Sequence, residues 1–135
     1  MDELSQQNAV SEVVAASWER CRMNGMDSNQ VPTPVRLTGK ELENRLKSSL
    51  SMARVAHPFM DRIASFVSSE WPVFLGDSKG CVVSATGESG LSPISTATLE
   101  VGTLWSEQHQ GTNALSLVID EKTPCQVIGH EHYLK

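Results

Sequence analysis

Aromatic residues and cysteines are scarce in this chain of 135 residues. Aromatic side chains make up 5% of it, and the cysteines are Cys21, Cys81 and Cys125. Their number is odd, they lie far apart in the sequence and none belongs to a CxxC pair, so the sequence predicts neither a disulfide framework nor a zinc knuckle. Each thiol is predicted to be reduced and to fill a small space in the core.

Long apolar runs and excess positive charge are also lacking. No stretch approaches the roughly 20 apolar residues that a membrane-spanning helix needs, and the first ten residues do not have the pattern of a secretion signal. The 16 acidic residues outnumber the 11 basic ones, for a net charge of −5, which works against binding a phosphate backbone. We therefore expect a cytoplasmic chain with no membrane contact and no direct nucleic-acid contact.

The usual catalytic loops are missing as well. Neither a GxSxG elbow nor the phosphate-cradling patterns GxxxxGK[ST] and GxGxxG occur, which disfavours an exposed serine nucleophile and nucleotide hydrolysis. We expect no enzymatic activity and no cofactor. With 39% hydrophobic residues, the chain can bury about two-thirds of its unfolded surface around one apolar core.

Helical periodicity marks the first half of the chain. Apolar residues at three-and-four spacing from Val10 to Cys21 predict a helix that stops at Asn24-Gly25, and residues 27–37, with two prolines, predict an extended connector. A capping box is predicted at Thr38 and Glu41. Two helices should follow and meet at a kink at His57-Pro58, with apolar stripes at Leu42, Leu46, Leu50 and Ala53, then at Phe59, Ile63, Phe66 and Val67, ending near Ser69.

Beyond Pro72 the pattern changes to that of short strands. Val73–Leu75 and Cys81–Val83 predict a β-hairpin, because the Asp77-to-Gly80 spacing between them suits a type I turn. The remaining predictions are a loop over 84–93, a helical turn over 94–99, a helix from Ala114 to Ile119 and a third strand over 125–128.

The segment from Trp105 to Asn113 carries the most information about function. Trp105, Glu107, Thr112 and Asn113 crowd the start of the helix predicted at Ala114, where free N–H groups can bind a carboxylate, phosphate or carbonyl oxygen. The structural alternative is that Thr112 or Asn113 simply caps its own helix while Trp105 packs beneath it.

Two other patterns have functional and structural interpretations. His130 and His132 could share a metal if they lay on one strand, with Cys125 or His109 completing the set of a metal-dependent hydrolase; the alternative is hydrogen-bonded or exposed histidines. Residues 17–22 could form a basic patch with an aromatic, although a solvated helix face with Trp18 turned into the core is favoured. The apolar stripe of this first helix could also pair with a second copy, giving a homodimer.

Taken in order, several segments resemble the N-terminal sensor region of sigma-54-dependent activators of acetoin and glycerol (dihydroxyacetone) metabolism. The match runs from about Ser11 to Tyr133 and is carried by residues 17–21, 25–27, the proline-containing connector, and residues 75–80, 102–113 and 129–133. The resemblance implies an α+β, GAF-like fold, an antiparallel sheet flanked by helices. It also implies residues 1–37 as N-terminal helix and connector, with 38–135 as the sensor domain.

The resemblance further implies a non-enzymatic module that senses a small oxygenated metabolite, such as acetoin, or a regulatory protein partner. The ligand would lie between the sheet and the segment carrying Trp105, Glu107, Thr112 and Asn113. An interaction module without a small-molecule ligand is the alternative. The ATPase and helix-turn-helix domains of such regulators are not found in this sequence.

The family's sheet also continues past the Glu131-His132 motif into two strands and a closing helix. Without them, we expect an incomplete fold at the C-terminal end, with unpaired backbone and an exposed apolar face, which would self-associate or be completed by a partner.

Overall fold

The computed structural model describes residues 10–67, 71–86 and 100–134. Residues 84–86 of the loop predicted over 84–93 belong to a strand instead. The rest of that loop and the helical turn predicted over 94–99 lie outside the described residues. The helix that was predicted to end near Ser69 ends at Phe66. The elements are helices α2 (Glu12–Met23), α3 (Gly39–Phe66), α5 (Glu107–Gln110) and α6 (Ala114–Glu121), strands β1 (Val73–Gly76) and β2 (Val82–Thr86), and a 3₁₀ turn (Gly129–Glu131).

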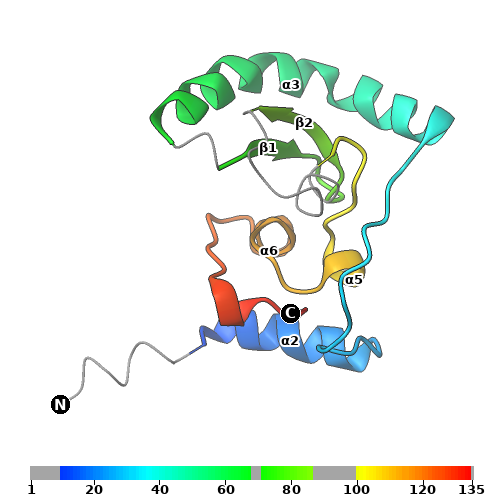
Figure 1. Ribbon diagram of the computed structural model, residues 1–135, viewed down its shortest axis with the longest axis vertical. Helices are drawn as coiled ribbons and strands as arrows, with labels where there is room; N and C mark the ends of the chain where they lie inside the picture. The colour runs from blue at the N-terminus through cyan, green and yellow to red at the C-terminus, as the bar shows by residue number, and fades with distance from the viewer. Residues whose placement is uncertain (1–9, 68–70, 87–99, 135) are drawn as a thin grey trace.

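These elements are stacked in layers (Figure 1). Helix α3 lies across one face of the β1–β2 hairpin, and α6 lies on the opposite side of the hairpin. Helix α2 packs beneath α5 and α6, so that the beginning and the end of the described chain share one layer. The arrangement is α+β, as predicted, and no helix among these residues is long and apolar enough to cross a membrane.

Helix α2 forms where the periodicity predicts it. The Ser11 side chain accepts a hydrogen bond from the Val14 N–H and so caps the first turn. The helix ends at Asn24, and Gly25 follows with a φ of +78°, a backbone conformation that favours glycine. Its buried face carries Val14, Ser17 and Cys21, and this face is covered by α5 and α6 of the same chain.

Helix α3 corrects two predictions. It runs unbroken through Pro58 instead of dividing into two kinked helices. Residues 57–59 are exposed, so the Arg54 carbonyl that Pro58 cannot bond is free to meet water. Thr38 is the N-cap residue, but its side chain makes no capping bond, because Gly39 at φ +58° takes the first turn out of helical geometry. The predicted capping box is therefore wrong.

The β-hairpin is confirmed. Strands β1 and β2 pair antiparallel from Val73 opposite Thr86 to Gly76 opposite Val82. In the turn, Oδ1 of Asp77 accepts hydrogen bonds from the N–H groups of Lys79 and Cys81, at 2.9 and 3.0 Å. The other carboxylate oxygen binds Arg45 of α3 at 2.7 Å, which ties the turn to the helix above it.

An extended segment that the sequence did not reveal lengthens this sheet. Gly102 and Thr103 exchange backbone hydrogen bonds with Val82, and the other edge of the segment bonds to the end of the connector: Leu37 N–H donates to Gly102, and Leu104 N–H donates to Val35. The connector and residues 102–104 thereby satisfy each other's backbone groups beside β2.

The main core lies between α3 and the sheet. It consists of Leu37, Cys81, Val83 and Leu104, with Leu42, Leu46 and Leu75 packed against it. The predicted role of the thiols as core filler is confirmed for Cys81 and Cys21, at 0% and 1% exposure, and Cys125 is half-buried. Burial raises the pKa of the Cys21 and Cys81 thiols.

The third strand predicted over 125–128 is wrong. These residues pair with no strand. They lead from α6 into the 3₁₀ turn at Gly129–Glu131, which lies beside α2. There the Trp18 indole N–H donates to the Glu131 carbonyl at 2.7 Å, and the Tyr133 hydroxyl donates to the Met26 carbonyl at 2.8 Å. These residues fasten α2, not the sheet.

Candidate functional site

A cleft of about 400 Å³ opens between α2, α5, α6 and the hairpin turn. Its walls carry both charges and few large apolar groups, which suits a small polar molecule better than a lipid or an aromatic ring. The lining residues are Arg20, Asn24, Lys79, Ser106, Glu107, Gln108, Ser116, Ile119 and Asp120.

Glu107 is the predicted site residue that lines this cleft. Arg20 of α2 grips both its carboxylate oxygens, with Nε–Oε1 and Nη2–Oε2 distances of 2.8 Å, and the Ser17 hydroxyl donates to Oε2 at 2.6 Å. Burial alone would raise the pKa of Glu107, but the hydrogen bonds from Arg20 and Ser17 and the charge of Arg20 outweigh it and lower that pKa. Glu107 is therefore ionised at neutral pH.

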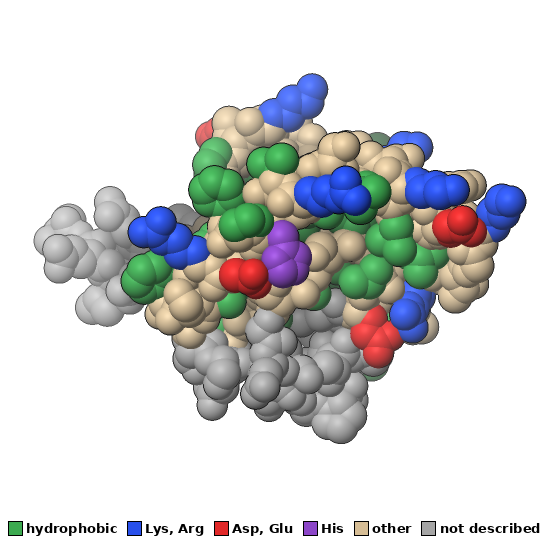
Figure 2. All heavy atoms as spheres, turned by 90° about the horizontal axis from the view of Figure 1, so that it is seen from above, with side chains coloured by type: hydrophobic (Ala, Val, Ile, Leu, Met, Phe, Trp, Pro, Cys, Tyr) green, Lys and Arg blue, Asp and Glu red, His purple; other side chains and the backbone are tan. Residues whose placement is uncertain are grey.

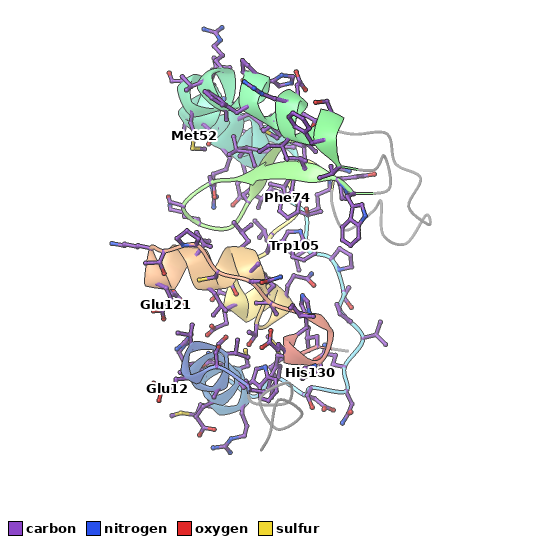
Figure 3. All side chains as sticks on the ribbon, turned by 90° about the vertical axis from the view of Figure 1, so that its left-hand side faces the viewer. Glu12, Met52, Phe74, Trp105, Glu121 and His130 are labelled. Carbon is purple, nitrogen blue, oxygen red and sulfur yellow. The ribbon has the colours of Figure 1, made fainter. Side chains whose placement is uncertain are left out.

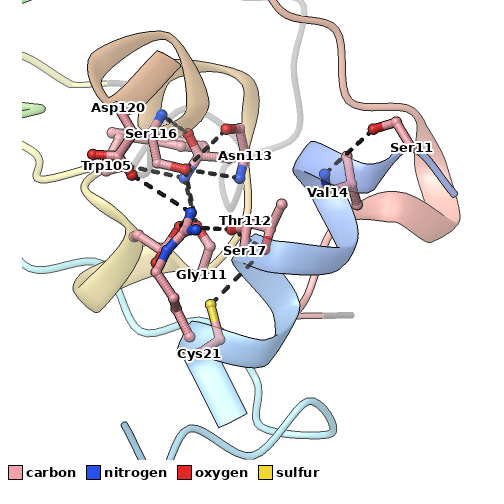
Figure 4. Close-up of polar contacts among 12 residues, drawn as sticks. Ser11, Val14, Ser17, Cys21, Trp105, Gly111, Thr112, Asn113, Ser116 and Asp120 are labelled. Atoms are coloured by element: carbon pink, nitrogen blue, oxygen red, sulfur yellow. Dashed lines mark hydrogen bonds and ion pairs between the residues drawn. The ribbon is translucent and has the colours of Figure 1, made fainter. Parts of the chain in front are cut away.

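Thr112 lies on the buried side of the same contact. Its hydroxyl is 2.6 Å from the Ser17 hydroxyl and 3.8 Å from the Cys21 sulfur, and its exposed fraction is 0% (Figure 4). Because Ser17 gives its one hydroxyl proton to Glu107, Thr112 donates to Ser17 and the Cys21 thiol donates to Thr112. We call Ser17, Arg20, Glu107 and Thr112 the polar clamp.

Asn113 and Trp105 form a second contact. The Asn113 side-chain oxygen accepts the Ser116 N–H at 2.9 Å, and its amide donates to the carbonyls of Trp105 and Gly111, each at 2.9 Å. The structural alternative is thus confirmed for Asn113, which caps α6. The Trp105 ring lies between the hairpin and α6, with its centroid 6.0 Å from that of Phe74 (Figure 3).

The structure therefore brings the four predicted residues together, in two internal contacts. Glu107 reaches Thr112 through Ser17, and Asn113 reaches the Trp105 carbonyl. Ligand binding by these four residues stays a prediction. Their observed contacts join α2 and the start of α6 to the segment between them.

The sequence did not single out the α2 half of the clamp. Arg20 was assigned to a solvated helix face, whereas its side chain is 42% exposed and bound to Glu107. The available signal was Ser17, a small polar residue on the buried stripe between Val14 and Cys21. Lys79 and Asp120 of the cleft carried no signal at all, since the turn and α6 meet only in the fold.

The two histidines lie elsewhere. His130 is in the 3₁₀ turn and His132 follows it, and both line a smaller recess of about 200 Å³ beside Trp18 and Tyr133. The strand on which they were expected to share a metal is not formed. Within the part of the chain that the structure describes, no three His, Cys, Asp or Glu side chains are grouped to hold a metal ion.

Replacing Glu107 by glutamine is expected to destabilise the protein by about 1–2 kcal/mol at pH 7. The half-exposed arginine loses its opposite charge, and one acceptor oxygen is replaced by an NH2 group that cannot accept its hydrogen bond. The folded pKa of Glu107 is lowered, so its contribution is complete above the unfolded pKa of about 4.3 and is lost as pH falls through the folded value. The difference between the two proteins should therefore shrink on acidification.

Urea unfolding of both proteins between pH 7 and pH 3 measures this difference. Glu121→Gln, at the exposed end of α6, is the control and should leave the pH dependence unchanged. A constant gap between wild type and Glu107→Gln over this range would contradict the prediction.

A solved structure has the same fold as this chain. The chain has the fold of DhaR(N) in the crystal structure of the E. coli DhaR(N)–DhaL complex, with a TM-score of 0.81 and 22% identity over 92% of this chain and 42% of that one. The predicted α+β, GAF-like fold is thereby confirmed. No family model matches the chain.

Two of the three sequence relatives carry the names of transcriptional regulators. The chain is 26% identical over 122 residues to the acetoin dehydrogenase operon transcriptional activator AcoR of Bacillus subtilis. It is 25% identical over 129 residues to a signal-transduction and transcriptional-control protein of Clostridium beijerinckii. A third relative, 27% identical over 133 residues, is an uncharacterized 47.3 kDa protein in the thcA 5′ region of Rhodococcus erythropolis.

These alignments cover 89%, 93% and 96% of this chain, but only 20%, 20% and 30% of the relatives. The chain thus spans about a fifth of the length of AcoR. The resemblance to sensor regions of activators of acetoin and glycerol metabolism, predicted from the sequence, is confirmed.

Proposed function

We propose that this chain is a signal-sensing domain of a transcriptional regulator and has no catalytic role. The observation that carries the proposal is the DhaR(N) fold, together with the similarity to AcoR along most of the chain. The domain division proposed from the sequence is residues 1–37 as an N-terminal helix and connector and residues 38–135 as the sensor domain.

The signal proposed is a small, neutral, oxygenated metabolite bound in the cleft. Glu107 and Arg20 of its lining are paired with each other, so neither charge needs a ligand of opposite charge, and a neutral molecule suits them. Gln108 offers its side-chain amide to the oxygens of such a molecule, and Ile119 offers an apolar wall. The hydroxyls of Ser106 and Ser116 are already bonded to His109 and Asn113. A guest seated there would contact α2, α5 and α6 together.

Because Thr112 and Asn113 are buried and hydrogen-bonded within the protein, substituting them tests folding more than binding. Ile119→Trp is the sharper test, since it fills the cleft from a half-buried position. Val118→Trp is its control, on the adjacent, 38% exposed position that does not line the cleft.

Isothermal titration with acetoin, dihydroxyacetone and glycerol is expected to detect binding of at least one of them to the wild type and to Val118→Trp. Ile119→Trp should bind at least tenfold more weakly while keeping its thermal transition. Equal affinity in Ile119→Trp would remove the cleft assignment, and no binding of any of the three to the wild type would remove the metabolite proposal.

The second candidate signal is a protein partner. It is favoured by the DhaR(N) structure, which is a complex with DhaL. Co-elution of this chain with purified DhaL in size-exclusion chromatography, unaffected by the metabolites, would support it. Failure to co-elute at tens of micromolar concentration would count against a DhaL-type partner.

A further inference from the structure

The second half of α3 exposes an apolar stripe. Met52, Val55, Phe59, Ile63 and Phe66 have exposed fractions of 42%, 70%, 66%, 51% and 80%. Figure 2 looks down on α3 and shows hydrophobic side chains gathered on this surface among scattered charges. Monomeric soluble proteins rarely leave such a continuous apolar row in water unless it marks an interaction site.

The stripe does not face the core. The face of the helix that is turned towards the hairpin carries small or buried side chains, including Ser49, Ala53, Ala56 and Met60. At 100° per residue, the stripe is centred about 100° away from this inner face. The sequence analysis joined Phe59, Ile63 and Phe66 to one apolar stripe with the leucines of the first half, but the structure places these two sets on different sides of α3.

The spacing of the stripe is symmetric about Phe59. Val55 and Ile63 lie four residues to either side of it, and Met52 and Phe66 lie seven residues to either side. A second, antiparallel copy related by a two-fold axis at Phe59 would set Val55 against Ile63 and Met52 against Phe66, in both directions. Self-complementarity of this kind is what a two-fold interface requires.

Charge does not oppose this pairing. In the antiparallel register Arg54 lies opposite Ala64 of the second copy, and Arg62 lies opposite Ala56. Neither guanidinium group is therefore set opposite another positive charge. The macrodipoles of two antiparallel helices also align favourably.

We propose that α3 is a self-association surface on which a second copy of this chain binds antiparallel through the stripe. A fully covered Phe buries roughly 150–250 Å², so the five partly exposed side chains offer on the order of 500 Å² of apolar surface per copy. With the surrounding polar rim, this approaches the roughly 800 Å² per partner of a stable interface. The stripe would form the interface's dry centre.

A dimer through α2, predicted from the sequence, is the competing arrangement. The apolar face of α2 is occupied by α5 and α6 of its own chain, so a dimer there would use the exposed side of α2. Met23, which is 74% exposed, is the large apolar residue on that side.

Sedimentation velocity of the 135-residue chain between 1 and 200 µM tests the proposal. The wild type is expected to shift with concentration towards twice the 14.7 kDa mass of one chain. Phe59→Lys, which sets two like charges at the two-fold axis, should raise the dissociation constant at least tenfold. Leu50→Lys, on the opposite flank of α3, and Met23→Lys, on α2, are the controls and should dimerise as the wild type does.

Cross-linking defines the register. In a Cys125→Ser background, Phe59→Cys should form an intermolecular disulfide under mild oxidation, whereas Leu50→Cys should not, because only position 59 meets its own copy at the axis. A wild type that stays monomeric up to 200 µM overturns the proposal. So does loss of dimerisation in Met23→Lys with none in Phe59→Lys, or stronger cross-linking at position 50 than at position 59.

Discussion

Gly80→Ala is expected to lower the free energy of unfolding by about 3 kcal/mol. Gly80 ends the hairpin turn at φ +83°, which costs an L-amino acid roughly 1–2 kcal/mol. An added Cβ would also lie 2.7 Å from the backbone nitrogen of Ser106, and overpacking of this kind typically costs a further 1–3 kcal/mol. The turn and the backbone at Ser106 cannot move apart easily to relieve this contact, since the Trp105 N–H donates to the Gly80 carbonyl at 2.7 Å.

Gly25→Ala separates the two causes. Gly25 has a similar φ of +78°, but nothing lies within 4 Å of the position that its Cβ would take. It should therefore lose only the conformational part, about 1 kcal/mol. Chemical denaturation of the two variants and the wild type measures the difference; equal losses would show that the approach of Ser106 to the turn is not a constraint.

Ser17→Val should have an effect of similar size, about 3 kcal/mol, in the polar clamp. Ser17 is fully buried, and its hydroxyl joins Glu107 to Thr112. Valine removes that hydroxyl, leaves the Thr112 O–H without its acceptor and adds a methyl group to a filled space.

The loss should be concentrated where α2 meets α5 and α6. Hydrogen exchange is expected to speed up in α2 and at the start of α6, while β1, β2 and α3 keep their protection. Ala16→Val, one residue earlier on the exposed side of α2, controls for the lower helix propensity of valine and should cost less than 1 kcal/mol. Uniform acceleration across all elements would contradict a local role for the clamp.

Local signals in the sequence were sufficient where one segment decides its own structure. The turn residues Asp77 and Gly80 predicted the hairpin, because the side-chain bonds and the positive φ of such a turn lie within a few residues. The start of α6 was predicted for the same reason, since its capping contacts join Asn113 and Ser116, three residues apart.

The missed features depend on residues far apart in the chain. The segment over 125–128 has strand-like composition, but a strand also needs a sheet edge beside it, and this segment leads into the turn at Glu131, which bonds to α2. Pro58 predicted a kink by a local rule, yet the exposed position of this turn removes the reason for one. Glu107 was identified as a site residue, but its partner Arg20 could not be, because nothing local links positions 87 apart.

The long reach of the contacts made by α2 has a consequence for the newly made chain. Its hydrogen bonds to Glu107 and Glu131 span 87 to 113 residues, so α2 is synthesised long before these partners. Until α5 and α6 follow, the face of α2 that they cover stays in contact with solvent. Docking of α2 should thus be a late event in folding, because it closes a loop of this length.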